Sequence, residues 1–196
     1  MRWLCQLFIP LLVFLAGCAG QPASTPDPDW SRHSAELAQL ENWELTGKLA
    51  LRTSEGSESA NLSWQQQQRR SMLKLSGPLG SQATNIDSDG ETVEIRRGDQ
   101  RETWDLSQPV TGPMGLDLPL RALPYWIKGI PAPDLPVDSM KVALERELLE
   151  NLSQEGWHIR YEEYDLFQGL MLPTRLQLER EDTRVRLIVR EWRTGP

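Results

Sequence analysis

The stretch "WELTGKLALR", residues 43–52, alternates between two kinds of residue. The even positions are charged or polar except for Ala50, and the odd positions are apolar or glycine: Trp43, Leu45, Gly47, Leu49 and Leu51. Because successive side chains of a β-strand point to opposite faces, this period of two predicts a strand with one buried face. The fold class follows from this stretch, since the same pattern recurs along most of the chain.

The alternation continues toward the middle of the chain, where apolar residues lie two positions apart at residues 60–64, 73–75 and 93–95. The turn-forming sequences "SEGSES", "GPLG", "SDGE" and "RGDQ" separate these segments and a further one around Trp104. Short turns between closely spaced strands predict antiparallel hairpins.

The final third also alternates, at residues 157–161, 176–178 and 185–189. Residues 141–153 allow two interpretations. They can form a strand that pairs with the next one through the turn "QEG", or a helix, because Leu144, Leu148 and Leu152 are four positions apart. The hairpin turn that follows favours the strand, and the sequence leaves both open.

Two helices are predicted. Asp27 as N-cap and Pro28 at the first helical position begin one that extends to about Glu41. The sequence "LRALPYWIKGIP", residues 120–131, predicts a shorter one that ends at Gly129. We therefore expect a mainly β (α+β) fold: a curved antiparallel sheet of about ten or eleven strands, with helices packed into its concave face.

The first residues, "MRWLCQLFIPLLVFLAGCAG", have the layout of a secretory signal: one cation, an apolar stretch and then small residues. The apolar stretch is too short for a typical transmembrane helix, which needs about 20 residues. Residues 15–18, "LAGC", match the bacterial lipobox, which predicts cleavage before Cys18 and a diacylglycerol on its thiol. A plain secretory signal with an incidental cysteine is the alternative. We expect a lipoprotein signal peptide at 1–17, a lipidated flexible tether at 18–26 and a single domain at 27–196.

The predicted cleavage determines the cysteine chemistry and the location. It removes Cys5 and the lipid occupies Cys18, so no cysteine remains for a disulfide, a nucleophile or a metal. Two or three acyl chains give stable membrane attachment, whereas one gives only reversible binding. An aspartate after the cysteine commonly retains Gram-negative lipoproteins in the inner membrane. Ala19 stands there instead, which favours the periplasmic face of the outer membrane.

Catalytic and metal-binding motifs are missing from the sequence. His33 and His158 are its only histidines, and no HExxH, CxxC, GxSxG or P-loop pattern occurs. The formal net charge of -7 argues against nucleic acid and against adhesion to anionic lipid. Acidic stretches such as "YEEYD", residues 161–165, leave a two-carboxylate glycosidase formally open, but solvated faces with ion pairs are favoured. We expect no enzyme activity, metal or cofactor.

The turn "GPLG", residues 77–80, carries a leucine where turns usually have Gly, Pro, Asn, Asp or Ser. Pro78 and Gly80 satisfy the backbone, so the sequence gives Leu79 no structural role in the turn. Leu79 either faces outward or folds back onto its own hairpin.

In order along the chain, several landmarks resemble the LolB family of outer-membrane lipoprotein receptors. They are the lipobox, Trp30, His33, Trp64, Pro78, Leu79, Gly80, Leu123, Trp126, Gly129, Pro131, Trp157, Ile159, Tyr161, Tyr164, Pro173 and Trp192. The likeness covers essentially the chain after the signal. Gly77, where asparagine would be expected, and Pro124, where a basic residue can occur, depart from the family pattern.

The resemblance implies an incomplete antiparallel β-barrel in which helices cover a hydrophobic cavity. Such a protein accepts acylated lipoproteins from the soluble periplasmic carrier LolA and delivers them into the outer membrane, as a monomer and without a cofactor. It also implies that the loop of Pro78, Leu79 and Gly80 releases cargo into the membrane. Strand and helix phase give the candidate cavity residues Leu49, Leu62, Trp64, Leu73, Leu75, Trp126 and Ile127. A membrane-tethered scaffold or sensor without an acyl-binding cavity is the alternative.

Overall fold

The computed structural model describes residues 28–77, 83–106, 119–143, 145 and 147–195. Its elements are α1 (Pro28–Gln39), β1 (Asn42–Thr53), β2 (Gly56–Gln67), β3 (Arg70–Ser76), β4 (Thr84–Ser88), β5 (Thr92–Arg97), β6 (Gln100–Asp105), α2 (Leu123–Trp126), β7 (Ser139–Ala143), β8 (Leu148–Gln154), β9 (Trp157–Phe167), β10 (Leu170–Arg180) and β11 (Thr183–Thr194). The strands form one 11-stranded sheet in the order β6-β5-β4-β3-β2-β1-β11-β10-β9-β8-β7. All neighbours are antiparallel, which confirms the predicted sheet.

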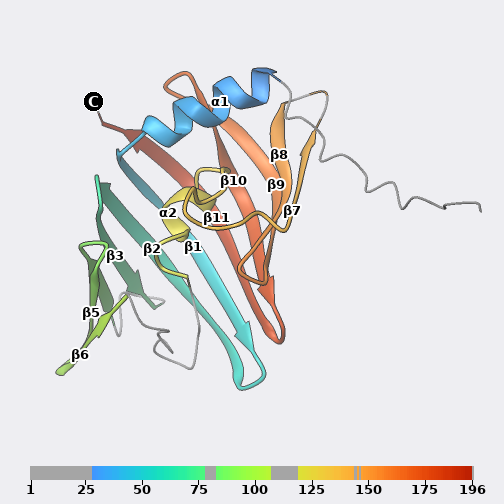
Figure 1. Cartoon of the computed structure of the whole chain (residues 1–196). Coiled ribbons are helices and arrows are strands. Elements are labelled where there is room, and N and C mark those ends of the chain that lie inside the picture. Colours follow the sequence, from blue (N-terminus) through green and yellow to red (C-terminus); the bar gives the residue numbers. More distant parts are fainter. Residues whose placement is uncertain (1–27, 78–82, 107–118, 144, 146, 196) are drawn as a thin grey trace, which may run out of the picture.

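The sheet is curved and open, with β6 and β7 at its two edges (Figure 1). Helix α1 lies across the end of the sheet where β1 begins and β11 finishes, which we call the α1 end. The short α2 lies within the curve of the sheet (Figure 1). Because the strands alternate in direction, β3 finishes and β4 begins at the opposite end, which we call the far end.

The first and last strands pair in the middle of the sheet. Trp43 lies opposite Thr194, and the register shifts between Thr46 and Gly47. A Cβ atom on Gly47 would lie 2.3 Å from the carbonyl oxygen of Ile188, so only glycine fits at this close approach.

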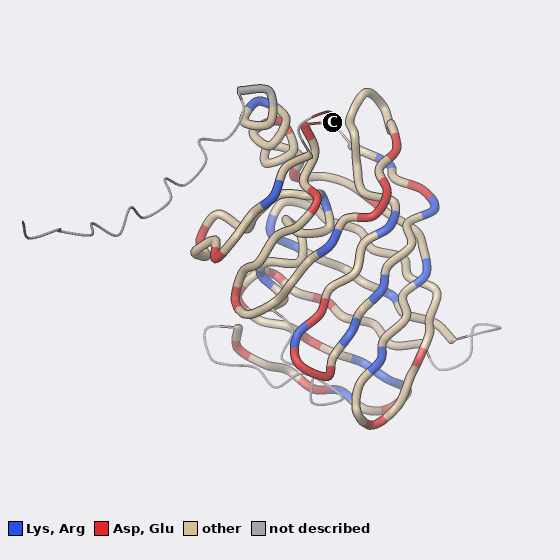
Figure 2. Tube along the Cα trace, turned by 90° about the vertical axis from the view of Figure 1, so that its right-hand side faces the viewer, with Lys and Arg blue, Asp and Glu red and all other residues tan. Residues whose placement is uncertain are grey.

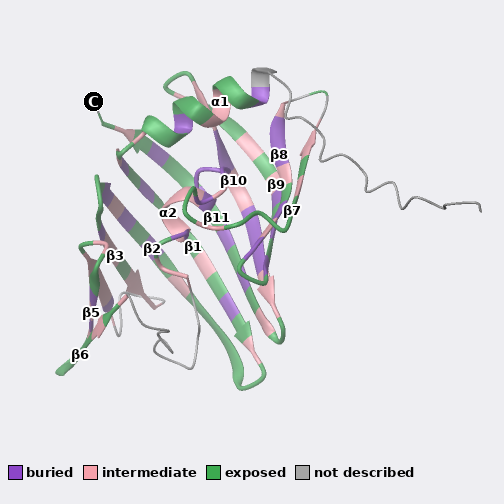
Figure 3. Ribbon diagram, in the orientation of Figure 1, coloured by how far each residue is buried: buried purple, intermediate pink, exposed green. Residues whose placement is uncertain are grey.

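The core lies on the concave face, as the alternation in residues 43–52 predicts. Trp43 and Leu45 are buried while Glu44 and Lys48 are exposed, and Figure 3 shows the same alternation on neighbouring strands. The Trp43 ring centroid lies 5.1 Å from that of Trp64 and 5.2 Å from that of Trp192. Aromatic contacts thus join β1 to both of its neighbours.

Charged residues of both signs are interspersed along the strands (Figure 2). Glu163 of the acidic stretch at 161–165 pairs with Arg175 at 2.7 Å, and Glu162 with Arg160 at 2.9 Å. These carboxylates form ion pairs on the outer face of the sheet, as the favoured interpretation of this stretch predicts.

The structure resolves the ambiguity at residues 141–153 in favour of strands, but as two strands. β7 ends at Ala143 and β8 begins at Leu148, with the amide of Glu147 donating to the carbonyl of Ala143 at 2.8 Å. Both the helix and a single continuous strand are wrong here, because the chain reverses. Helix α1 also stops at Gln39, slightly before the predicted Glu41, and α2 has only four residues.

Several predicted features lie outside the described residues. They are the signal peptide at 1–17, the tether at 18–26 with Cys18, the N-cap Asp27, and the turn residues Pro78, Leu79 and Gly80. Within the part of the chain that the structure describes, no helix has the length and apolarity needed to cross a membrane.

Candidate functional site

The candidate cavity residues divide into two groups. Leu62, Trp64, Trp126 and Ile127 are buried members of the central core. Leu49, Leu73 and Leu75 are only partly buried and pack against that core. An inward-facing leucine that stays partly exposed leaves apolar surface on the concave side of the sheet. The second group therefore has the accessibility that ligand contact requires.

The register aligns apolar side chains from four strands into one inward-facing row. Trp64 pairs with Leu73, Leu73 with Ile86, and Ile86 with Ile95. Cross-strand partners lie on the same face of a sheet, so these residues are neighbours. We call Trp64, Leu73, Ile86 and Ile95 the apolar row. Leu73 and Ile86, at its centre, are half-buried.

A polar row lies beside it, nearer the α1 end. Gln66 pairs with Ser71, and Ser71 with Ser88; each is two positions along its strand from a member of the apolar row. The buried Gln66 accepts hydrogen bonds from Ser71 Oγ and from Trp64 Nε1, and its amide donates to the carbonyl of Gln68 at 2.7 Å. The inner face of the sheet thus changes from apolar to polar over two residues.

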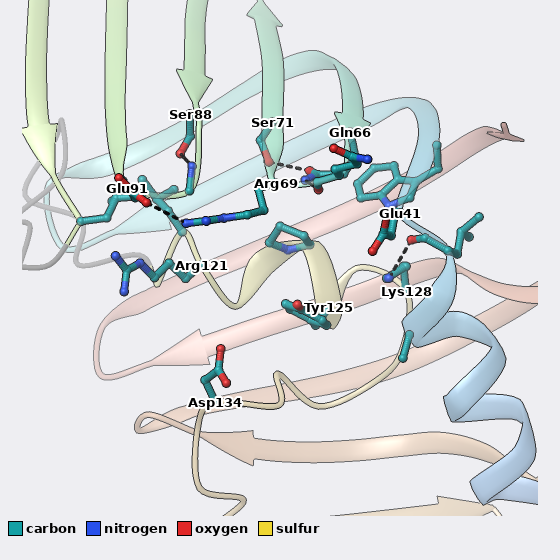
Figure 4. Close-up of a pocket in the computed structure, with 18 residues that line it drawn as sticks. Glu41, Gln66, Arg69, Ser71, Ser88, Glu91, Arg121, Tyr125, Lys128 and Asp134 are labelled. Carbon is teal, nitrogen blue, oxygen red and sulfur yellow. Dashed lines mark hydrogen bonds and ion pairs between the residues drawn. The ribbon is translucent and has the colours of Figure 1, made fainter. Parts of the chain in front are cut away.

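A pocket of about 520 Å³ opens over the polar row (Figure 4). It lies between the C-terminal end of α1, the β2–β3 and β4–β5 turns, and the segment around α2. None of the candidate cavity residues lines it. Sequence reasoning missed this pocket because its walls combine polar residues with apolar ones such as Trp43, Leu120 and Tyr125, from segments far apart in the chain.

Charged groups of both signs line the pocket. Arg69 and Glu91 form an exposed ion pair at 3.2 Å, and Arg121 and Asp134 lie on the side formed by the α2 segment (Figure 4). Lys128 forms part of the wall next to α1.

Lys128 is buried, with 4% of its surface exposed. Its Nζ donates to the carbonyl oxygens of Leu37, at 2.7 Å, and Leu40, at 3.0 Å, and lies 5.4 Å from the Tyr125 ring centroid. Leu37 lies in the last turn of α1 and Leu40 directly follows the helix, and the Leu37 carbonyl also accepts from the Leu40 amide at 3.2 Å. Burial lowers the pKa of Lys128 to about 8, although the nearby charge of Glu41 opposes the shift. Lys128 joins α1 to the α2 segment.

Gln154 and Tyr161 hold α2 against the sheet. The Gln154 side-chain oxygen accepts from Trp126 Nε1 at 2.8 Å and from the Ala132 amide at 2.9 Å, and its Nε2 donates to the Ala132 and Leu135 carbonyls. Tyr161 Oη donates to the Trp126 carbonyl at 2.9 Å, and burial raises the pKa of Tyr161. Polar contacts therefore fix the helix that borders the pocket.

The histidines take part in local packing. Burial lowers the pKa of His33, while Glu36 and the Met171 carbonyl act in the opposite direction. His158 Nδ1 lies 2.8 Å from Ser153 Oγ on the exposed face. The described residues contain no group of three His, Cys, Asp or Glu side chains placed to hold a metal ion.

The fold and the partly covered inner face define an incomplete antiparallel β-barrel with apolar surface on its inner side. Two solved structures share this fold. One is a LolA superfamily protein from Nitrosomonas europaea, with a TM-score of 0.53 and 12% identity over 89% of this chain and 95% of that protein. The other is a DUF1329 family protein from Desulfovibrio piger, with a TM-score of 0.56 and 7% identity over 85% of this chain and 91% of that protein.

The sequence narrows this class to one family. Residues 41–192 match the family profile described as outer membrane lipoprotein LolB. The outer-membrane lipoprotein LolB of Cellvibrio japonicus is 34% identical over 99% of this chain and 98% of its own length. That of Stutzerimonas stutzeri is 32% identical over 98% and 97%. The chain belongs to the LolB family, which confirms the resemblance seen in the sequence.

Proposed function

We propose that this protein accepts acylated lipoproteins from the periplasmic carrier LolA and incorporates them into the outer membrane. Membership of the LolB family supports the pathway, and one structural observation supports the mode of binding. The apolar row faces inward, yet Leu73 and Ile86 at its centre are only half-buried. This surface can contact an acyl chain without any change in the core.

The energetics of transfer favour such a carrier. Exposing an acyl chain of about 16 carbons to water costs on the order of 12 kcal/mol. Moving the acyl chain from one apolar binding face to another changes the free energy only by the difference in binding free energy between the two faces. A somewhat better receiving face, followed by a bilayer, gives the transfer its direction without nucleotide hydrolysis.

The proposed cycle makes and breaks no covalent bond. It therefore needs no catalytic residue, metal or cofactor, and a monomer is sufficient because one concave face supplies the binding surface. Together with the family, this supports a transport factor rather than an enzyme.

Cys18 is the proposed lipid attachment site, after removal of residues 1–17. Acyl chains there would hold the domain at the periplasmic face of the outer membrane through the tether at 18–26. A Cys18→Ser variant in which an ordinary cleavable secretory signal replaces residues 1–17 is expected to be released as a water-soluble protein, which cell fractionation would detect. Recovery of that variant in the outer-membrane fraction would contradict the assignment.

The loop of Pro78, Leu79 and Gly80 is the proposed site of membrane delivery. β3 ends at Ser76 and β4 begins at Thr84, both at the far end of the sheet, and the loop lies between them in the sequence. Burying one leucine contributes roughly 1.5–3 kcal/mol, which can bring a surface against lipid but cannot anchor a protein. Leu79→Asp is expected to accept cargo normally and to deliver it slowly to liposomes; delivery at the wild-type rate would refute this role.

Cargo transfer between purified proteins tests the proposed function. LolA loaded with a labelled acylated lipoprotein is mixed with the Cys18→Ser form of this protein, and transfer of the label is followed. Leu75→Glu places a charge on the half-buried inner face and should prevent acceptance. Lys74→Glu, on the exposed outer face of the same strand, is the matched control and should accept normally.

The same experiment distinguishes the proposed transport function from the alternative of a membrane-tethered scaffold or sensor. If the wild-type inner face takes up neither the acylated lipoprotein nor a labelled fatty acid, the protein is a tethered scaffold or sensor whose core is filled by its own side chains.

A further inference from the structure

We propose that the pocket over the polar row is a subsite for the uncharged polar head of the acylated cargo. The head comprises the ester and amide groups around the acylated cysteine and the first peptide units after it. This inference rests on the proposed function and specifies how one cargo molecule would lie on the inner face.

The first support for this arrangement is the register of β2 and β3. Trp64 and Gln66 are two residues apart on β2, and Leu73 and Ser71 are two apart on β3. Since a strand rises about 3.3 Å per residue, the apolar and polar rows are about 7 Å apart. An amphiphile whose acyl chain crosses the apolar row along the strand direction, toward the far end, would therefore place its head over the polar row.

The charges of the pocket indicate which kind of head fits. Three cations and three anions line it: Arg69, Arg121 and Lys128, with Glu41, Glu91 and Asp134. Arg69 pairs with Glu91, and two of the donor positions of Lys128 are occupied by the carbonyls of Leu37 and Leu40. A site with balanced charges offers no excess cation to a phosphate or a free carboxylate. Esters and peptide groups, which are dipolar and uncharged, match it better.

The size of the pocket agrees with this chemistry. Its volume of about 520 Å³ falls in the range of roughly 300–1,000 Å³ typical of small-molecule sites. Hydrogen bonds within the protein hold the side chains of Gln66, Ser71 and Ser88 in place along the pocket wall.

A pair of substitutions on α1 tests the subsite. Ala38 lines the pocket and is exposed, whereas Ala35 is exposed on the same helix and does not line it. Ala38→Trp should fill the pocket without disturbing the core, and Ala35→Trp is the matched control. Both are made in the Cys18→Ser protein. Binding is measured with a fluorescent triacylated cysteinyl peptide, which has the polar head, and with labelled palmitate, which lacks it.

We expect Ala38→Trp to weaken binding of the acylated peptide by about tenfold or more, corresponding to about 1.4 kcal/mol, and to leave palmitate binding unchanged. Ala35→Trp should bind both probes like the parent protein. Unchanged peptide binding by Ala38→Trp, or equal weakening of both probes, would overturn the subsite. If the parent protein binds neither probe, the proposed function itself fails.

A second substitution guards against a folding defect. Arg121→Trp fills the same pocket from the α2 side, and Arg121 is also exposed. It should reproduce the selective loss of peptide binding. Should Arg121→Trp bind the acylated peptide normally while folded, the pocket would not hold the head.

Discussion

Lys128 Nζ lies 2.7 Å from the carbonyl oxygen of Leu37, a residue 91 positions earlier in the chain. This hydrogen bond, with a second one to Leu40, connects the C-terminal end of α1 to the segment that follows α2. A buried ammonium group is costly, and the structure compensates by placing it against two backbone carbonyls at the end of α1. Lys128 thus adds a buried polar contact to the packing of α1, whose Trp30 and Leu37 are buried in the core.

The protonation of Lys128 should be visible in the stability of the protein. Its pKa is lowered by burial to about 8 in the folded state and is about 10.4 when unfolded. Between these values the unfolded state binds more protons, so raising the pH stabilises the folded state. We expect the free energy of unfolding to rise from pH 7.5 to 9.5 relative to that of Lys128→Met, as measured by urea denaturation.

The exposed Lys48 on β1 provides the control for this measurement. The difference between the wild type and Lys48→Met should stay constant over the same pH range. A constant difference for Lys128→Met as well would mean that the buried ammonium does not titrate there.

Gln154 should be important for stability because its side chain is fully buried and makes four hydrogen bonds. Gln154→Leu leaves Trp126 Nε1 and the Ala132 amide without partners, and each unsatisfied buried group costs about 1–3 kcal/mol. We expect a loss of about 3 kcal/mol in the free energy of unfolding. Gln67→Leu, at an exposed position of β2, should change it by less than about 0.5 kcal/mol.

Gly47 should not tolerate a side chain. An added Cβ would lie 2.3 Å from the Ile188 carbonyl oxygen, so β1 and β11 must separate locally. We expect Gly47→Ala to destabilise the protein by about 3 kcal/mol. At Gly195 the nearest atom to an added Cβ is 3.4 Å away, an ordinary contact, so Gly195→Ala is the control in the same thermal denaturation experiment. Equal melting temperatures for the two variants would show that the β1–β11 pairing adapts.

The turn between β4 and β5 should weaken at low pH. The Asp89 carboxylate accepts from the amides of Glu91, at 2.8 Å, and Thr92, at 2.7 Å, and these bonds lower its pKa. Because the pKa of Asp89 is lowered, its carboxylate stabilises the turn at pH values above the ordinary pKa of an aspartate. This stabilisation is lost as the pH falls. The protection factor of the Thr92 amide, which corrects for the slower intrinsic exchange at low pH, should therefore fall on acidification in the wild type, whereas Asp89→Ala should show low protection throughout. Strong protection of the Thr92 amide in Asp89→Ala would mean that backbone hydrogen bonds alone hold the turn.

The strands were predictable because a period of two is a local property of the sequence. Trp43 and Leu45 face the core wherever the rest of the sheet lies. The reversal between β7 and β8 was not predictable, because no Gly, Pro or Asn marks it. There Glu147 adopts a positive φ of 55°, which the local sequence gives no reason to expect.

The candidate site was only partly predictable for a related reason. Strand phase indicates that Trp64 and Leu73 share a face, but not that Trp64 is fully packed while Leu73 stays half-exposed. That difference depends on what the rest of the chain places above each residue. The polar pocket and the buried Lys128 were missed because polar residues in a sequence resemble surface residues until distant segments enclose them.

The central pairing of β1 with β11 has a consequence for how the chain matures. A polypeptide that emerges amino terminus first exposes the free edge of β1, with Trp43 and Leu45 beside it, until Thr183–Thr194 has also emerged. Unpaired apolar edges are sites of aggregation. The centre of the sheet can therefore close only after the last strand has been synthesised, and in a prematurely terminated chain β1 stays unpaired on one side.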